Sequence, residues 1–130
     1  MNLLIVEKEP LELENLARTF IADGYQVVVI GHPRQALEAA SFRQFHAAII
    51  NYDLPDMDGI ELTRRLRATQ RSLQVILLAD KPLPANMAFA CLVKPYGLLS
   101  LAMMVRDACE EAAEVAFEIA SCRKKNCVLQ

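Results

Sequence analysis

Four polar side chains in the sequence follow directly on short apolar runs, and their types are suited to metal or anion chemistry. They are Glu7, Lys8, Asn51 and Lys94. Mg²⁺ prefers carboxylate oxygens, but here one carboxylate stands against two ammonium groups, which leaves one net positive charge. We therefore expect Mg²⁺ binding to be weak or absent, and no other cofactor is indicated. The amide of Asn51 cannot act as a nucleophilic oxyanion in covalent chemistry.

The apolar runs that carry these side chains have the composition of buried strands. They are short and nearly continuous in hydrophobicity, which is typical of strands buried on both faces of a parallel sheet. They occupy residues 3–6, 27–30, 47–50, 75–79 and 91–93. In a doubly wound sheet, functional groups gather at the carboxyl ends of the strands. The four side chains should therefore meet at one edge, together with Glu9, Ala79, Asp80 and Pro95.

Helical patterns alternate with the strands. The first helix carries an apolar stripe with spacings of three and four residues, made of Leu13, Leu16, Ala17, Phe20 and Ile21. Asp23-Gly24 should end this helix, a second should run from Pro33 to about Arg43, and a third should follow Gly59. This alternation predicts βαβ units with right-handed crossovers in an α/β sheet.

The fourth crossover is unusually short. Only residues 80–90 separate the last two strands, whereas a parallel crossover usually needs about a dozen residues or more. The segment also contains Pro82 and Pro84. We expect a shortened fourth helix of at most one or two turns, beginning near Pro84.

The last helix is predicted to be long, from about Leu98 to Lys124. Its apolar stripe consists of Leu98, Leu101, Val105, Ala108, Ala112, Val115, Ile119 and Cys122. The first three turns, as far as Ala108, should pack on the domain's own sheet, which divides the chain into a domain at 1–108 and an extension at 109–130. The continued stripe favours a partner helix, with a dimer seam at Ala112, Val115, Ile119 and Cys122.

The composition indicates one globular domain. The chain has 130 residues, of which 54% are hydrophobic and 23% are charged, enough for a single core. The net charge of -2 is mixed along the chain and gives no basic face for nucleic acid. No segment reaches the roughly 18 apolar residues of a membrane span. We expect a cytoplasmic protein without direct nucleic acid or membrane contact, whose four cysteines are reduced thiols.

A recognisable signature stands at residues 51–59, with the sequence Asn-Tyr-Asp-Leu-Pro-Asp-Met-Asp-Gly. It resembles the signature of response regulator receiver domains, an aspartate followed by x-x-[Leu/Met]-Pro-x-x-Asp-Gly. Lys94-Pro95 resembles the family's lysine and cis-proline after the fifth strand. The resemblance covers residues 1–108 and implies a flavodoxin-like fold with strand order 2-1-3-4-5. It also implies a non-enzymatic role in two-component signal transduction, exerted through protein contacts.

The departures from the family pattern fall at the positions that carry its chemistry. The resemblance places Asn51 at the phosphoacceptor position and Glu7 and Lys8 at the acidic pair that holds Mg²⁺. It places Asp53 where a backbone carbonyl would bind the metal. The switch hydroxyl and the switch aromatic are replaced, while the family lysine is retained; these positions are Ala79, Cys91 and Lys94. The pattern implies a pseudo-receiver that works without phosphorylation.

Alternatives for this altered pocket remain open. Lys8 could replace the metal and bridge Glu7 to the carbonyl oxygen of Asn51, which would fix the domain in one state. Alternatively, Lys8, Lys94 and Asn51 could bind a small anion and make the domain a ligand sensor. An unusual phosphorylation route, for example on Asp53, is a further alternative. The expected partners are proteins, either a second copy through the last helix or a C-terminal effector domain.

Overall fold

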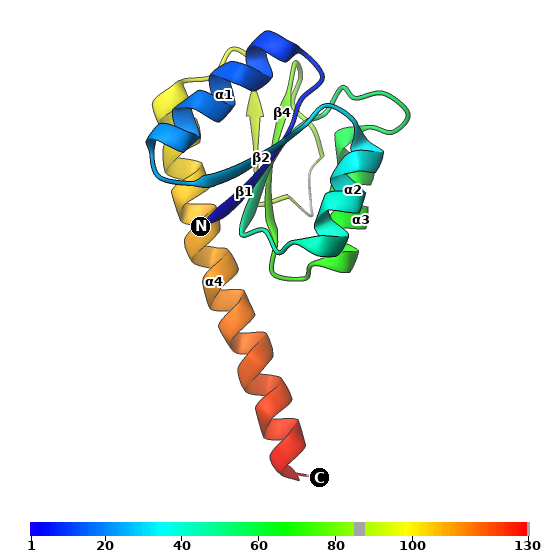
Figure 1. Cartoon of the computed structure of the whole chain (residues 1–130), viewed down its shortest axis with the longest axis vertical. Helices are drawn as coiled ribbons and strands as arrows, with labels where there is room; N and C mark the ends of the chain where they lie inside the picture. The colour runs from blue at the N-terminus through cyan, green and yellow to red at the C-terminus, as the bar shows by residue number, and fades with distance from the viewer. Residues whose placement is uncertain (85–87, 130) are drawn as a thin grey trace.

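The structure is a computed structural model of the chain, and it describes residues 1–84 and 88–129, with side chains as far as residue 122 (Figure 1). The strands are β1 (Asn2–Val6), β2 (Gln26–Ile30), β3 (Ala47–Asn51), β4 (Gln74–Ala79) and β5 (Ala90–Val93). The helices are α1 (Pro10–Ala22), α2 (Pro33–Phe42), α3 (Gly59–Thr69) and α4 (Leu98–Leu129). The strands form one parallel sheet in the order β2-β1-β3-β4-β5, which confirms the predicted flavodoxin-like topology.

Two apolar layers hold the helices to the sheet. Side chains of a strand alternate between its faces, so Leu4 and Val6 of β1 join one layer while Leu3 and Ile5 join the other. The first layer lies between the sheet and the helices α2 and α3, and the second lies between the sheet and the helices α1 and α4 (Figure 1). Both faces of the central strands are therefore covered, which explains their continuous hydrophobicity.

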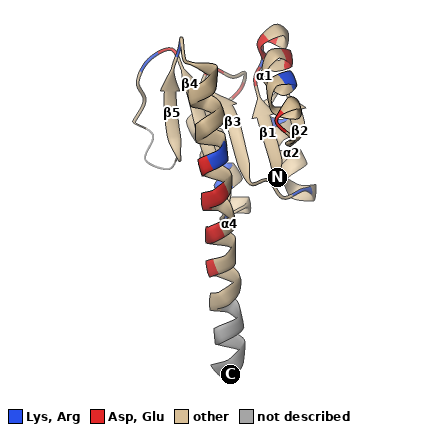
Figure 2. Ribbon diagram, turned by 90° about the vertical axis from the view of Figure 1, so that its left-hand side faces the viewer, with Lys and Arg blue, Asp and Glu red and all other residues tan. Residues whose placement is uncertain are grey.

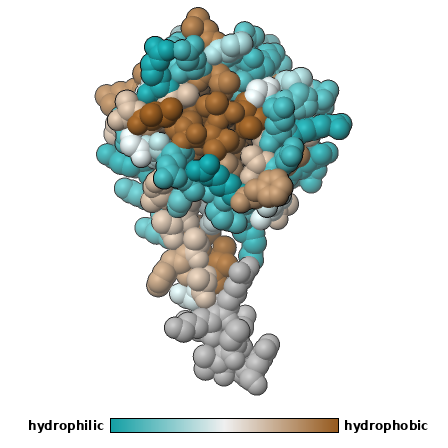
Figure 3. Space-filling view, in the orientation of Figure 1, coloured by the Kyte–Doolittle hydropathy of each residue, from teal (hydrophilic) through white to brown (hydrophobic). Residues whose placement is uncertain are grey.

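The prediction that every strand is buried on both faces is wrong for the two edge strands. Every residue of β3 and β4 is buried, but Val29 of β2 is 44% exposed and Val93 of β5 is 38% exposed. Each edge strand has a neighbour on one side only. Apolar atoms accordingly gather over β2 at the surface in Figure 3.

The end of α1 and the starts of α2 and α3 agree with the sequence predictions. Gly24 adopts a positive φ of 94° directly after α1, a conformation that glycine reaches without a steric penalty. His32 is the N-cap of α2, and its Nδ1 accepts a hydrogen bond from the Arg34 backbone N–H at 3.2 Å. Asp58 caps α3 in the same way. These local contacts set where the helices begin and end.

The fourth crossover contains no helix among its described residues, which are 80–84 and 88–89. The predicted helix start near Pro84 runs directly into residues 85–87, which lie outside the described part of the chain. Leu83 and Ala88 pack against the core layer on the side of α2 and α3. The described part of the crossover therefore covers some of the sheet without forming a helical turn.

The last helix, α4, leaves the domain and projects beyond the sheet (Figures 1 and 2). It has 32 residues and ends at Leu129, later than the predicted end at Lys124. Burial reaches Ala112, which is 2% exposed, one turn beyond the predicted boundary at Ala108. Ala112, predicted as part of a dimer seam, is thus already covered by its own domain. No helix in the described residues has the length and apolar composition to cross a membrane.

Candidate functional site

The carboxyl ends of the strands bring the predicted site residues to one edge of the sheet. Asn51 is the last residue of β3 and Ala79 the last of β4, while Glu7 directly follows β1 and Lys94 directly follows β5. β1 and β3 are neighbours in register, with Val6 paired to Ile50. The next residues along the two strands therefore lie next to each other.

The centre of the site is a buried hydrogen bond between an amide and a carboxylate. The Asn51 Nδ2 donates to Glu7 Oε2 at 2.7 Å, and the two residues are only 5% and 1% exposed. The Glu9 backbone N–H donates to the other Glu7 oxygen at 3.1 Å. The Asp53 backbone N–H donates to Asn51 Oδ1 at 3.1 Å. These donors stabilise the buried Glu7 carboxylate, and both polar atoms of the Asn51 amide are engaged.

Lys8 does not bridge Glu7 and Asn51, so that prediction is wrong. Its Nζ pairs instead with Asp53 Oδ2 at 2.7 Å, at the surface. The hydrogen bond with Asp53 raises the pKa of Lys8. The reason for the outward position is desolvation, because moving an ammonium group into the buried site would cost more than a solvated ion pair. Asn51 already supplies the donor that the Glu7 carboxylate needs.

Lys94 turns towards helix α1. Its Nζ lies 3.3 Å from Glu12 Oε1, and both side chains are partly exposed. Our interpretation of the sequence did not include Glu12, because an acidic residue in the first turn of a helix is common for reasons of the helix dipole alone. Both lysines are thus paired with carboxylates, Asp53 and Glu12, that the charge comparison had omitted. The net positive pocket inferred from the sequence is not present.

A cavity of about 440 Å³ opens beside this centre, at the ends of β3 and β4. It is lined by Asn51, Tyr52, Asp53, Ala79, Asp80, Lys81, Pro82 and Leu83. Neither Lys8 nor Lys94 belongs to the lining, so the cavity is not the lysine pocket that the anion interpretation required. The small side chain of Ala79 forms one wall of the cavity and offers no hydroxyl group to a ligand.

The loop after Asn51 explains the glycine of the signature. A Cβ atom on Gly59 would lie 2.8 Å from Tyr52 Cα and 2.9 Å from the Asn51 carbonyl oxygen, both of which are backbone atoms. Glycine therefore allows the start of α3 to approach the end of β3. Within the loop, Asp56 has a positive φ of 69°, and its carboxylate lies 3.0 Å from His32 Nε2.

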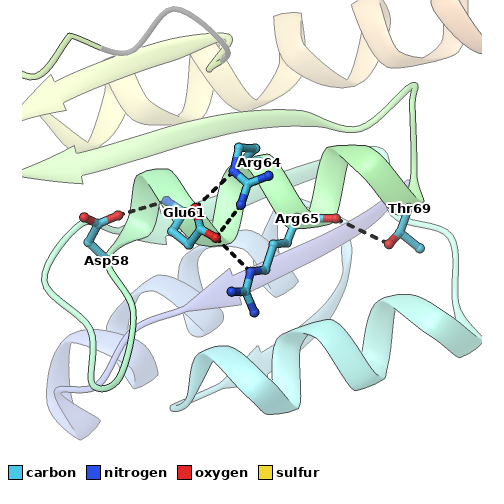
Figure 4. A network of polar contacts seen from close by, with 5 residues as sticks. All are labelled: Asp58, Glu61, Arg64, Arg65 and Thr69. Carbon is cyan, nitrogen blue, oxygen red and sulfur yellow. Dashed lines mark hydrogen bonds and ion pairs between the residues drawn. The ribbon is translucent and has the colours of Figure 1, made fainter.

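The aspartate of the signature has a structural role at the start of α3. Asp58 Oδ1 accepts a hydrogen bond from the Glu61 backbone N–H at 2.8 Å (Figure 4). Along the same exposed helix face, Arg64 and Arg65 hold the Glu61 carboxylate through hydrogen bonds that lower its pKa to about 2. No residue of α3 is among those that line the cavity, so these contacts stabilise the helix beside the site.

Other predicted positions are found where expected. The peptide bond between Lys94 and Pro95 is cis, which confirms that prediction. Cys91 packs from β5 against the apolar layer under α2 and α3. Cys109 is buried, which raises the pKa of its thiol to about 11 and makes it a poor nucleophile. Cys91, Cys109 and Cys122 are free thiols.

The residues at the centre of the site do not fit Mg²⁺. Among the described residues, Glu7 directs its carboxylate at the centre, and its two oxygens accept hydrogen bonds from Asn51 and Glu9. The Asp53 carboxylate faces Lys8. The described residues contain no group of three or more His, Cys, Asp or Glu side chains placed to hold a metal ion. A hard cation needs more oxygen ligands than this arrangement offers.

Comparison with known proteins connects this chain to one family. The family model of the response regulator receiver domain matches residues 3–106. The sensor protein TorS of Escherichia coli (strain K12) is 38% identical over 77 residues, which is 58% of this chain and 8% of that protein. The chain spans only 35% of the probable transcriptional regulatory protein TcrX of Mycobacterium tuberculosis, with 27% identity over 81 residues.

Solved structures show the same fold. A receiver domain protein (CheY-like) from Methanospirillum hungatei superposes with a TM-score of 0.81 at 21% identity, covering 87% of this chain and 96% of that chain. A structure described as adenylate cyclase from Rhodopirellula baltica has a TM-score of 0.86 at 17% identity, with 95% of this chain and 97% of that chain covered. At these identities the likeness establishes the architecture.

Proposed function

The chain belongs to the response regulator receiver family, and from this membership we propose that it is a receiver domain that acts through protein contacts without being phosphorylated. The observation that supports this proposal is the hydrogen bond of 2.7 Å between Asn51 and Glu7. It occupies the position where the family pattern requires a nucleophilic carboxylate.

The chemistry of the Asn51 amide supports this proposal. An acyl phosphate forms when a carboxylate oxygen attacks phosphorus, and the nitrogen of Asn51 instead donates its hydrogen to a buried carboxylate. An amide nitrogen in this role has no lone pair available for attack. Phosphoryl transfer in general relies on Mg²⁺ to neutralise developing charge, and the donor set around Glu7 does not fit that ion.

The contacts at the site also support a domain held in one state. Asn51 joins β3 to Glu7 after β1, and Lys8 joins the same loop to Asp53 after β3. These contacts connect the loops after β1 and β3 directly. We propose that they do so permanently, and that signalling depends on which partner binds and not on a covalent switch. The proposal assigns no enzymatic activity to the domain.

A direct test is to incubate the protein with Mg²⁺ and acetyl phosphate and to measure its intact mass. We expect no mass change for the natural sequence. The double variant Lys8→Asp/Asn51→Asp restores two carboxylates beside Glu7 and is the matched control, for which a gain of one phosphoryl group is expected. A phosphoryl gain on the natural sequence would overturn the proposal, and loss of that gain in Asp53→Asn would place the group on Asp53.

A second candidate function is that of a small-ligand sensor, and the cavity of about 440 Å³ is the observation that favours it. Both lysines of the predicted anion site are already paired, so a ligand would have to contact the cavity lining and not these cations. A rise in the unfolding midpoint on adding nucleotides or small anions would support this function. Lys81→Ala, which changes the lining, should then reduce that rise.

The partners are proposed from the projecting part of α4. The chain spans 8% and 35% of the length of two curated relatives that it matches, and we propose an effector region as a further partner of the receiver. Val115 and Ile119 continue the apolar stripe of α4 beyond the domain and are only half-buried, which supports a helical partner, and we propose a homodimer through this helix. The helix is compatible with both partners, because it can pair with a second copy and still connect to an effector region.

A further inference from the structure

The projecting part of α4 carries an apolar stripe that the described domain covers only in part. Beyond Ala112, the last residue buried against the domain, Val115 and Ile119 are half-buried and Cys122 is exposed. Residues 112–129 extend for about 27 Å at the rise of an α-helix. A helical segment of this length is only marginally stable in water without a packing partner. The stripe therefore needs a covering element.

The direction of the stripe restricts where that element lies. Leu101, Val105 and Ala108 are fully buried against residues of β3 and β4, and they follow the same spacing of three and four residues as Val115 and Ile119. The stripe is thus one continuous face of α4, packed on the sheet above Ala112 and open below it. A covering helix must lie directly beneath the base of the domain.

A groove marks this position. It has a volume of about 250 Å³ and lies between the projecting helix and the base of the domain. It is lined by Gln44, Thr69, Gln70, Arg71, Ser72, Ala116, Ile119 and Ala120. The small side chains of Ala116 and Ala120 leave room for a second helix to come close to α4.

The sheet excludes one of the two orientations of such a helix. A partner helix parallel to α4 on this face would continue upwards past Ala112 into the space that β3 and β4 occupy. An antiparallel helix enters from below, ends at the base of the domain, and meets no obstacle. The geometry therefore favours an antiparallel helix.

The charge sequence of the segment favours a second copy in that orientation. Glu110, Glu111, Glu114 and Glu118 are exposed, and the acidic residues of this part of α4 form a row in Figure 2. The sequence then changes sign, with three basic residues at 123–125. A parallel pair in register would place acidic next to acidic and basic next to basic. In an antiparallel pair with the register proposed below, positions 123–125 of one copy lie beside Glu118 of the other and about one turn from Glu114, which is electrostatically favourable.

We propose that two copies of this chain pair through residues 112–129 of α4 in an antiparallel arrangement, so that the end of each helix docks in the groove at the base of the other domain. The apolar spacing selects a register in which position 115 faces position 126 of the second copy. This inference specifies the homodimer of the proposed function, and it does not depend on whether the domain is phosphorylated.

Solution mass tests the pairing. We expect a light-scattering mass of twice that of one chain for the natural sequence. Ile119→Asp, on the stripe, should give the mass of one chain with an unchanged circular dichroism spectrum of the domain. Phe117→Asp is the matched control, because Phe117 is 73% exposed and does not line the groove, and it should remain a dimer. A single-chain mass for the natural sequence at every concentration would overturn the proposal.

Disulfide cross-linking tests the orientation. In a background with Cys91, Cys122 and Cys127 changed to serine, two single variants are made, Val115→Cys and Asn126→Cys. Positions 115 and 126 lie about 16 Å apart along a helix, too far for a disulfide in a parallel pair in register. Oxidation of the mixed variants should give the 115–126 product. Dominant 115–115 and 126–126 products would overturn the antiparallel arrangement.

A control and a separate readout complete the experiment. The control is Glu114→Cys in the same background, because position 114 lies away from the stripe. It should not cross-link with Asn126→Cys. Equal cross-linking would show that the contacts are non-specific and would overturn the proposal. The phosphorylation test measures the mass of a single denatured chain. Its result therefore does not depend on whether the protein is a monomer or a dimer. A failed dimer and a failed phosphorylation-independent function are therefore distinguishable.

Discussion

Replacing Asn51 with aspartate should destabilise the domain, although aspartate is the residue that the family pattern has at this position. In Asn51→Asp, the donor at 2.7 Å from the buried Glu7 carboxylate becomes an acceptor. The lost hydrogen bond to a charged group is worth about 1.5–3 kcal/mol. Two carboxylates about 4 Å apart would repel by about 4 kcal/mol at an effective dielectric constant of about 20, but protonation of one of them limits this cost.

We expect a net loss of about 3 kcal/mol in the free energy of unfolding at pH 7 without Mg²⁺. For a domain of this size, this corresponds to a decrease of about 10 °C in the melting temperature. Urea denaturation followed by circular dichroism gives the free energy directly. Added Mg²⁺ should restore part of the loss in Asn51→Asp, because two carboxylates then face each other, and should leave the natural sequence unchanged.

The double variant Glu7→Gln/Asn51→Asp is the decisive control. It exchanges the amide and the carboxylate across the same contact, so the hydrogen bond returns in the opposite direction and the repulsion disappears. It should be more stable than Asn51→Asp by about 2 kcal/mol, a coupling that a double-mutant cycle measures. The reasoning fails if Asn51→Asp matches the natural sequence without Mg²⁺, or if the double variant shows no recovery.

Three further predictions concern the supporting structure. Gly59→Ala should cost about 1–3 kcal/mol in urea denaturation, because its Cβ would meet backbone at 2.8 Å; a neutral effect would contradict the close approach. Gln70→Ala should lower the free energy of unfolding by about 2–4 kcal/mol, since the Gln70 side chain forms hydrogen bonds with three backbone groups. Stability equal to that of the natural sequence would contradict this role of Gln70. Burial lowers the pKa of His46, so stability present above pH 6.5 should fall as the pH drops through that value towards the folded pKa; His46→Gln should flatten this part of the curve, and an unchanged slope would exclude His46 as its cause.

The linear sequence was enough to predict the strands, the end of α1, the starts of α2 and α3, and the family pattern. Gly24 after α1, Pro33 at the start of α2 and Gly59 at the start of α3 act within a few residues of their own positions. Such signals depend on local backbone preferences and on periodicity, both of which are present in the linear chain. The amide at position 51 was equally predictable from the linear chain, because the chemistry of an amide does not depend on its neighbours.

The partners of the charged side chains were decided by the tertiary structure. Lys8 and Lys94 lie at the predicted edge of the sheet, but neither lines the cavity, and their partners Asp53 and Glu12 were not predicted. Lys8 and Asp53 are 45 residues apart in sequence, and several acceptors lie within reach of each lysine. Desolvation then selects the exposed partner over the buried one, and the exposure of each acceptor is known only once the sheet is assembled.

The path of α4 shows the same division. Its apolar stripe is visible in the sequence, and so is the continuation beyond the domain. The sequence could not show that Ala112 is still covered by the domain or that the open stripe faces its base. Both facts depend on how far the sheet extends along the helix. The long-range packing of the domain determines that extent. The stripe predicts that a partner exists, and the position of the sheet determines from which direction that partner can come.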